Sequence, residues 1–550
     1  MNPNIKPIFW RWLPWLIITF GIILRLDQYL FNRSLWLDEV LFAVNVVNHT
    51  FLELFEPPLD YVNYNRPPGF LLMAKLSVTW FGNSDFILRF FPFFCGVLAL
   101  LLYYPMAKRY VSERAVPLAL FFFAISEALI FYSSEFKQYS SDVLIVILLF
   151  LLIATYRTHA LTFTRLFILA IVGMMAIWFS YASVFILATI GIYLALPYLV
   201  KKQWQPVIKL TAVYLVWLLN FALLYFFFLH VETPLDKWVD QFWVIENTFM
   251  PSPFSVEGIY WLYNQFFMIL ENPGSLGSVQ KAGLASLQLA GFCVIIGCIV
   301  LFAEKKWTLF LLTFPVVIVL CVSFFHQYPF NERLLLFLTP ALYLILAEGI
   351  TKIQITISNS SLSSVYTMIA KVIFIAFLVI YPTYKAIRHF YYPRVIQEIK
   401  PILAHIEKHR QSKDIVYLYY WAEPAFRYYA TNYNFNYDNC HIITPIPKNE
   451  YTKEVEYFRR KQGLKPVSVD KTQCILGISE SFYQSQPDLD QLQNRGRVWV
   501  VFSHISGHER NLFLNYLDTK GVRIDDNWQP GASGHLYDLQ MLPLKFLLSD

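Results

Sequence analysis

Residues 8–43 read IFWRWLPWLIITFGIILRLDQYLFNRSLWLDEVLFA, an apolar run that ends in a polar boundary. The run over residues 8–30 is close to the ~20 residues that a helix needs to cross a bilayer. Asp38 and Glu39 follow it side by side, where the chain would leave the lipid. The stretch therefore predicts a first membrane span followed by an acidic pair at the water–lipid boundary.

The chain repeats this apolar pattern as far as residue 385. Of its 550 residues 57% are hydrophobic and only 15% are charged, whereas soluble domains average about 25% charged residues. No small-residue cleavage site follows the first run, so we interpret it as a retained anchor. We expect a polytopic α-helical membrane protein with about eleven transmembrane helices, at residues 8–30, 85–107, 115–133, 141–157, 164–181, 182–200, 208–230, 284–303, 307–326, 333–350 and 366–384.

The charges of the loops orient these spans. With a cytoplasmic N-terminus, Lys and Arg residues fall in the loops expected on the cytoplasmic side, as the positive-inside rule requires. The opposite side receives two acidic segments, residues 31–60 and 231–283. Because eleven is an odd number, the C-terminal third is expected outside with the acidic loops. The predicted location is the plasma or inner membrane, and the net charge of +6 reflects these loops rather than nucleic-acid binding.

The membrane part is expected to cover residues 1–385. It includes a first extracytoplasmic loop at 31–84 and a second large one at 231–283. The first loop holds two apolar segments, 38–50 and 67–80, whose helical spacing is typical of helices that lie at a membrane surface. We therefore expect interfacial helices beside the acidic pair.

Residues 386–550 combine strand and helix patterns, which predicts an extracytoplasmic α/β domain. We expect strands at residues 415–420, 498–502 and 535–539, and helices at 397–410, 450–462 and 507–520. Cys440 and Cys474 lie in this domain, where an oxidising compartment would allow a disulfide. Their spacing leaves a disulfide and two free thiols as alternatives.

Asp38 and Glu39 are the first candidates for chemistry. Adjacent residues on a helix point about 100° apart, so one carboxylate is expected to act as a base while the other binds, orients or caps. A carboxylate beside lipid loses solvation, which raises its pKa towards the range of a general base. The alternative is a pair of solvated interfacial charges.

Arg66 precedes Pro67 and Pro68, which are suited to the first turn of a helix. The free N–H groups of such a turn form a partial positive site, and Arg66 adds a full charge. Together they would suit a phosphate. The alternative is an arginine that reaches up to the lipid headgroups.

Residues 132–142 form a short polar and aromatic loop, which is expected on the outer side. Lys137 is a candidate to bind a phosphate, while Glu135 and Asp142 are candidates to bind sugar hydroxyls or a cation. The alternative is an ordinary turn between two spans.

Arg333 lies at the outer mouth of a late span and is followed by three leucines and then Pro340. An arginine in that place can hold a lipid phosphate whose tail runs along the helix. His326 precedes it in the same loop and is either a ligand contact or a polar residue of the interface. No dinucleotide, P-loop, paired-cysteine, HExxH or GxSxG motif suggests another chemistry.

These features together resemble the large membrane glycosyltransferases of the GT-C fold, in the branch of protein O-mannosyltransferases and lipid A aminoarabinose transferases (glycosyltransferase family 39-like). The first acidic residue of the pair is the proposed catalytic base of that family, which is Asp38 here, with Glu39 in a supporting role. The family's Lys-Pro-Pro is residues 66–68 here, and its Glu-x-Arg-x-Tyr is residues 135–139.

The resemblance implies an inverting glycosyltransferase that moves a sugar from a polyprenyl-phosphate donor to a lipid, glycan or protein acceptor on the extracytoplasmic side. It implies phosphate contacts from Arg66, Lys137 and Arg333, and sugar or acceptor contacts from Glu135, Tyr139 and His326. No cofactor is required and no metal ligand is assigned, although a divalent cation is compatible.

Two other functions are weighed against this enzyme, a transporter or flippase of lipid-linked sugars and a membrane-anchored binding protein. Transporters place ionisable sites near the midplane of the bilayer, whereas the charges here cluster at the ends of spans. A binding protein would leave the polar outer clusters unexplained. The sugar and the acceptor stay open.

Overall fold

The computed structural model describes residues 8–55, 59, 61, 67–156, 160–229, 242–280, 283–360, 363–444 and 466–541. The chain forms two compact units. The first, which we call the helical unit, consists of Met1–Asn32 and Val62–Arg394. The second, the sheet unit, consists of Arg33–Tyr61 and Val395–Asp550. The expected boundary grouped residues 31–84 with the membrane part, whereas these units group 33–61 with the C-terminal residues.

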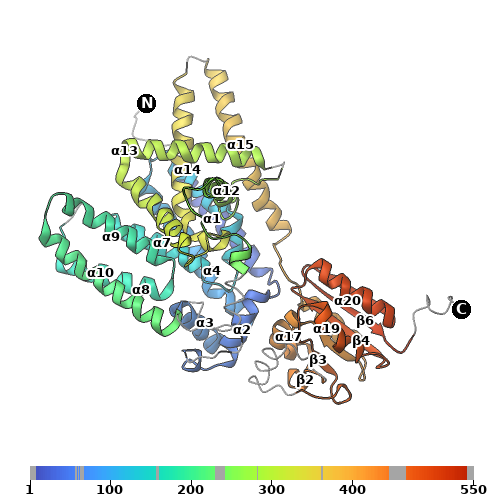
Figure 1. Cartoon of the computed structure of the whole chain (residues 1–550). Helices are drawn as coiled ribbons and strands as arrows, with labels where there is room; N and C mark the ends of the chain where they lie inside the picture. Colours follow the sequence, from blue (N-terminus) through green and yellow to red (C-terminus); the bar gives the residue numbers. More distant parts are fainter. Residues whose placement is uncertain are drawn as a thin grey trace. The chain divides into compact units, whose positions relative to one another are not determined.

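The helical unit is made almost entirely of apolar helices (Figure 1). Its elements are α1 (Ile8–Leu30), α3 (Pro68–Phe81), α4 (Asp85–Tyr110), α5 (Val116–Ile125), α6 (Glu127–Tyr132), α7 (Tyr139–Ile153), α8 (Phe163–Phe179), α9 (Ser183–Val200), α10 (Trp204–Leu224), η2 (Tyr225–Leu229), α12 (Val256–Glu271), α13 (Leu284–Phe324), η3 (Glu332–Leu338), α14 (Thr339–Ser358) and α15 (Ser364–Tyr391). Within the described ranges, seven helices are long and apolar enough to cross a membrane.

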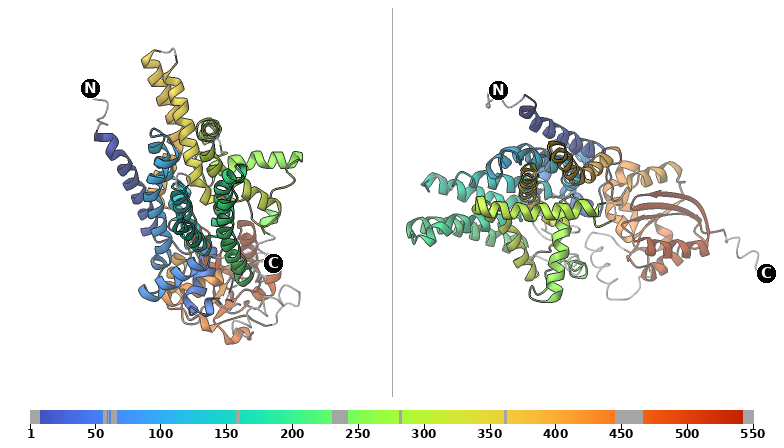
Figure 2. Two further views of the ribbon diagram at one scale, coloured as in Figure 1. Left: turned by 90° about the vertical axis from the view of Figure 1, so that its left-hand side faces the viewer. Right: turned by 90° about the horizontal axis from the view of Figure 1, so that it is seen from above.

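Each expected span overlaps one of these helices or two consecutive ones. Helix α13 covers two expected spans, and a non-helical backbone at Lys305 separates its halves (φ −142°, ψ 54°). The turn expected between residues 181 and 182 lies between α8 and α9, where the Ser183 hydroxyl donates to the Ser180 carbonyl at 2.6 Å. Helices α8, α9 and α10 lie alongside one another (Figures 1 and 2).

The span expected over residues 115–133 is divided into α5 and α6, because a distant side chain stabilises the break. Arg25 of α1 is buried and donates to the carbonyls of Phe123 (3.2 Å) and Ala124 (2.9 Å). The last carbonyls of a helix have no partner within the helix. Ser126 then begins α6 by accepting the N–H of Leu129 at 3.3 Å.

Helices α13 and α14 approach each other closely at glycines. A Cβ added to Gly297 would lie 2.0 Å from the Ile345 carbonyl oxygen. A Cβ added to Gly349 would lie 1.8 Å from the Cys293 carbonyl oxygen. Small residues at such contacts let two backbones pack where lipid supplies no hydrophobic driving force.

The sheet unit confirms the expected α/β domain. Its strands are β1 (Ile415–Leu418), β2 (Cys440–His441), β3 (Cys474–Leu476), β4 (Arg497–Ser503), β5 (Val522–Gln529) and β6 (Ala532–Asp538), in the order β2-β3-β1-β4-β6-β5. The first four strands are parallel, and β6 pairs antiparallel with both β4 and β5. Cys440 and Cys474 are opposite each other on β2 and β3 and form a disulfide.

The helices of the sheet unit are α16 (Lys400–His409), α17 (Glu423–Tyr429), α19 (Phe482–Asp490) and α20 (Gly507–Lys520). The helices expected at 397–410 and 507–520 are confirmed, while the one expected at 450–462 lies outside the described residues. The unit also contains α2 (Leu37–Asn48), close to the expected segment 38–50. Helix α2 is mostly buried and contacts α17.

Candidate functional site

The two carboxylates of the acidic pair have different surroundings at the first turn of α2. Glu39 is fully buried, and its Oε2 accepts the Trp36 N–H at 3.3 Å. The same oxygen lies 3.6 Å from Nη2 of the buried Arg33. Asp38 is only half-buried. Glu39 thus caps the helix and offsets a buried positive charge, whereas the Asp38 side chain is only partly covered by other residues.

The C-terminal part of the sheet unit fixes the stretch before α2. The Ser34 backbone N–H and hydroxyl donate to the two carboxylate oxygens of Glu398, at 3.0 and 2.9 Å. The Ser34 hydroxyl oxygen accepts the Lys400 N–H at 3.1 Å. The Leu35 N–H donates to the Tyr429 hydroxyl at 2.8 Å. Residues far apart in sequence thereby determine where the first turn of α2 begins.

His504, which the sequence analysis did not single out, lies close enough to Asp38 to interact with it electrostatically. Its Nδ1 is 2.5 Å from Nε2 of Gln397, and Oε1 of Gln397 accepts the Leu37 N–H at 2.9 Å. Because the amide nitrogen can only donate, Nδ1 accepts, and the proton of the neutral ring is on Nε2. Burial lowers the pKa of His504, and the negative charge of Asp38 acts in the opposite direction.

Trp421 stands beside this group. Its ring centroid is 6.2 Å from that of His504, in an edge-on arrangement. Its indole N–H donates to Oε2 of Glu480 at 2.7 Å. The acid and the neutral imidazole form a pair that can accept a proton from a hydroxyl, and the buried Trp421 ring packs beside the imidazole.

The loop between α6 and α7 holds Glu135, Lys137 and Tyr139 within the helical unit. Glu135 and Lys137 are both buried, and the Lys137 N–H donates to the Glu135 carbonyl at 2.7 Å. Tyr139 begins α7, and its ring packs edge-on against Tyr132 at 5.1 Å. The expected polar outer loop is therefore a folded turn with buried charges.

Arg333 lies on η3, close to the loop between α6 and α7, because η3 contacts both of these helices. Arg333, Glu135 and Tyr139 each interact electrostatically with Tyr132. The guanidinium of Arg333 also lies 5.8 Å from the centre of the Trp243 ring. Residues that were predicted from two separate stretches of sequence thus act on one tyrosine.

His326 and Arg66 do not add to this group. His326 is exposed, has a left-handed backbone (φ 57°), and stacks on Phe249 with ring centroids 4.8 Å apart. That position fits a polar residue at the water–lipid interface. The role of His326 as a sugar or acceptor contact stays a prediction. Arg66 lies outside the described residues.

A cluster at the end of α15 was missed. Oε1 of Glu127 is 3.1 Å from Nε2 of His389 and 3.6 Å from Nη1 of Arg394, and its Oε2 is 3.4 Å from Nζ of Lys385. Arg394 and Arg333 both interact electrostatically with Glu332. The sequence did contain a signal for this cluster. Several basic residues follow the span expected at 366–384, on the side predicted to be outside, where the positive-inside rule expects few.

No protein-family model and no curated protein sequence matches the chain. Solved structures do resemble it. ArnT from Cupriavidus metallidurans bound to undecaprenyl phosphate superposes with a TM-score of 0.51 at 9% identity, covering 96% of this chain and 98% of that one. Its apo state gives 0.50 at 11% identity, covering 95% and 97%. The apo oligosaccharyltransferase of Archaeoglobus fulgidus gives 0.50 at 11% identity, covering 98% and 76%.

At these identities the likeness shows the fold alone. It confirms that the chain has the GT-C fold of membrane glycosyltransferases, with apolar helices and a C-terminal α/β domain. The apolar helices and the shared fold also identify an integral membrane protein.

Proposed function

We propose that this chain is an inverting glycosyltransferase that moves a sugar from a polyprenyl-phosphate donor to a lipid, glycan or protein acceptor outside the cytoplasm. The observation that carries the proposal is the separation of the two carboxylates: Glu39 is buried in a structural role, while Asp38 stays half-exposed near a neutral histidine. The shared GT-C fold supports the same reaction class, since ArnT was solved with undecaprenyl phosphate.

Asp38 is the proposed base. It would take the proton of the acceptor hydroxyl while that oxygen attacks the anomeric carbon. The bond from the anomeric carbon to the donor phosphate oxygen breaks in the same displacement, which inverts the configuration. Glu39 would support the reaction by holding the first turn of α2 in place.

The donor phosphate would be held by cations at the end of the helical unit that carries η3 and the α6–α7 loop. Arg333 and Lys137 are the proposed phosphate contacts, and Arg66 is proposed with them from sequence. Cations offset the charge that develops on the leaving phosphate. Arg394 joins this set, because it shares Glu332 with Arg333.

An extracytoplasmic location is proposed for the sheet unit, and the Cys440–Cys474 disulfide supports it. Disulfides persist in oxidising compartments and are rare in the cytosol. The sheet unit would help to select the acceptor, because it carries Asp38 and His504. No cofactor is required for the displacement, although a divalent cation beside the donor phosphate is compatible with it.

The test uses the full chain in nanodiscs with a panel of polyprenyl-phosphate sugars and envelope lipids. Mass spectrometry of lipids and glycans from a deletion strain selects the donor and acceptor for the panel. We expect release of polyprenyl phosphate with wild-type protein and almost none with Asp38→Asn, while both bind undecaprenyl phosphate equally. Near-normal turnover by Asp38→Asn would refute the assignment of the base. Movement of donor across the bilayer without transfer would favour the flippase instead.

A further inference from the structure

Helix α16 presents two histidines one turn apart on the same side of the sheet unit. His405 and His409 are four residues apart, and their ring centroids are 4.3 Å apart. The helix lies close to β6 because Gly534 has no side chain: a Cβ there would be 2.8 Å from Cγ2 of Ile402. Helix α16 also contacts β5, so the two histidines are held beside that edge strand.

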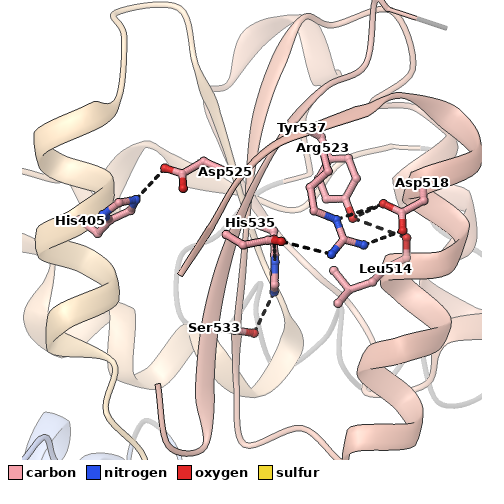
Figure 3. Close-up of polar contacts among 9 residues, drawn as sticks. His405, Leu514, Asp518, Arg523, Asp525, Ser533, His535 and Tyr537 are labelled. Atoms are coloured by element: carbon pink, nitrogen blue, oxygen red, sulfur yellow. Dashed lines mark hydrogen bonds and ion pairs between the residues drawn. The ribbon is translucent and has the colours of Figure 1, made fainter. Parts of the chain in front are cut away.

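Asp525 reaches this helix because β5 contains a bulge. The register pairs Arg523 with Tyr537 and Asp525 with Leu536, which leaves Ile524 as the extra residue. Side chains alternate between the two faces of a strand, and an extra residue shifts that alternation. Asp525 therefore faces α16, and its Oδ2 lies 2.7 Å from Nε2 of His405 (Figure 3).

The neighbouring charges belong to the other face of β5 (Figure 3). Arg523 pairs with Asp518 at 2.5 Å and with Asp526 at 3.4 Å. Asp526 also bonds Nδ1 of His535 at 2.5 Å. The cation nearest in sequence to Asp525 is thus engaged with other carboxylates.

We propose that His405, His409 and Asp525 bind a divalent transition metal of the zinc class. One ligating atom from each residue lies within 4.8 Å of the other two, and among the described residues this is the group of three that meets that criterion. Ligand atoms around a tetrahedral zinc are about 3.3 Å apart, given bonds of about 2.0–2.1 Å. Small rotations of the three side chains would bring the ligating atoms from within 4.8 Å of one another to this spacing.

The ligand chemistry favours this class of metal. Imidazole nitrogens with one carboxylate suit zinc and its neighbours, whereas calcium and magnesium prefer oxygen ligands alone. His409 has an outer partner, since its Nδ1 lies 2.9 Å from the His405 carbonyl oxygen. A hydrogen bond from Nδ1–H fixes the tautomer that offers Nε2 to a metal.

The site is open to solvent. The side chains of His405 and Asp525 are 24% and 33% exposed, and His409 is exposed. Three protein ligands leave a fourth position for water or an exchangeable ligand, as in open zinc sites. The site is built from α16 and β5 and shares no residue with the set assigned to sugar transfer, so it does not rest on the proposed function.

The experiment measures zinc binding by the full chain, purified through a tag without histidines and kept in nanodiscs. After loading and dialysis, elemental analysis should find one zinc per wild-type chain, and a chromophoric chelator gives its affinity. Asp525→Asn and His409→Asn should each weaken binding at least about 100-fold, beyond the 10–100-fold typical of outer-sphere changes. His508→Asn is the matched control, because His508 is also exposed in this unit and should leave binding unchanged.

The outcomes separate the proposal from general surface binding. Substituted Co²⁺ should give the absorption of a tetrahedral site in wild type and lose it in His409→Asn. His409 is exposed, so circular dichroism should find that variant folded. Less than one zinc per chain after dialysis, or equal affinity in wild type and both ligand variants, would overturn the proposal. Equal weakening by His508→Asn would also overturn it, because it would indicate adventitious binding to surface histidines.

Discussion

Replacing the two neighbouring carboxylates one at a time should separate catalysis from folding. Asp38→Asn removes a charge from the first turn of α2, where a carboxylate gains only about 0.3–1 kcal/mol from the helix dipole. Glu39→Gln keeps an acceptor for the Trp36 N–H but removes the charge beside Arg33. Breaking a buried pair by removing one partner costs about 3–5 kcal/mol. Glu39→Gln should therefore destabilise the chain several times more than Asp38→Asn.

Turnover should show the opposite order. A positioned general base contributes about 10²–10⁴-fold, which is about 3–5 kcal/mol of the barrier, so Asp38→Asn should lose at least that factor. The Glu39→Gln protein that remains folded should keep most of the rate. Tryptophan fluorescence during thermal unfolding in nanodiscs reports stability, and release of polyprenyl phosphate reports turnover. The reasoning fails if Asp38→Asn unfolds earlier than Glu39→Gln, or if the two variants lose equal turnover.

Three further results are expected. Gly349→Ala should sharply lower the yield of folded chain, because the new Cβ would lie 1.8 Å from the Cys293 carbonyl oxygen. Gly191→Ala is the control and should be tolerated, because its Cβ would lie 3.6 Å from the ring of Tyr214. Size-exclusion profiles in detergent compare the two variants. Arg333→Ala should weaken binding of undecaprenyl phosphate at least tenfold, measured by native mass spectrometry, and unchanged affinity would argue against its phosphate role. Burial lowers the pKa of His504, so the unfolded chain binds more protons at this residue than the folded chain does. The contribution of the neutral His504 to stability is therefore complete above about pH 6.5 and is lost as the pH falls. His504→Gln should flatten that part of the curve of unfolding temperature against pH.

The apolar helices were predictable because their signal is local. A run of about 20 apolar residues is long enough to cross a bilayer as a helix, and each expected span overlaps at least one described helix. The break between α5 and α6 was not predictable, because Arg25 lies about 100 residues away and donates to carbonyls that look like ordinary helix interior in the sequence. Strand β5 was missed for a different reason: it is polar and carries a bulge, so it lacks a clear apolar alternation.

The candidate site was found only in part. An acidic pair after a span is visible in the sequence, but the different roles of Asp38 and Glu39 depend on Arg33 and on burial. His504 could not be connected with Asp38, because more than 450 residues separate them and no spacing rule joins them. The cations predicted at three separate motifs could be grouped only by topology, and the contacts of η3 with α6 and α7 now place Arg333 beside the loop that joins those helices.

The assignment of residues 33–61 to the sheet unit has a consequence for building chimeras. The backbone enters and leaves this segment from the helical unit, yet its first turn is anchored by Glu398, Gln397 and Tyr429. An exchange of C-terminal domains between related proteins at residue 394 would therefore separate residues 33–61 from the rest of the sheet unit. The interchangeable part is discontinuous, so a chimera that keeps the sheet unit whole must exchange residues 395–550 together with the segment that bears Asp38.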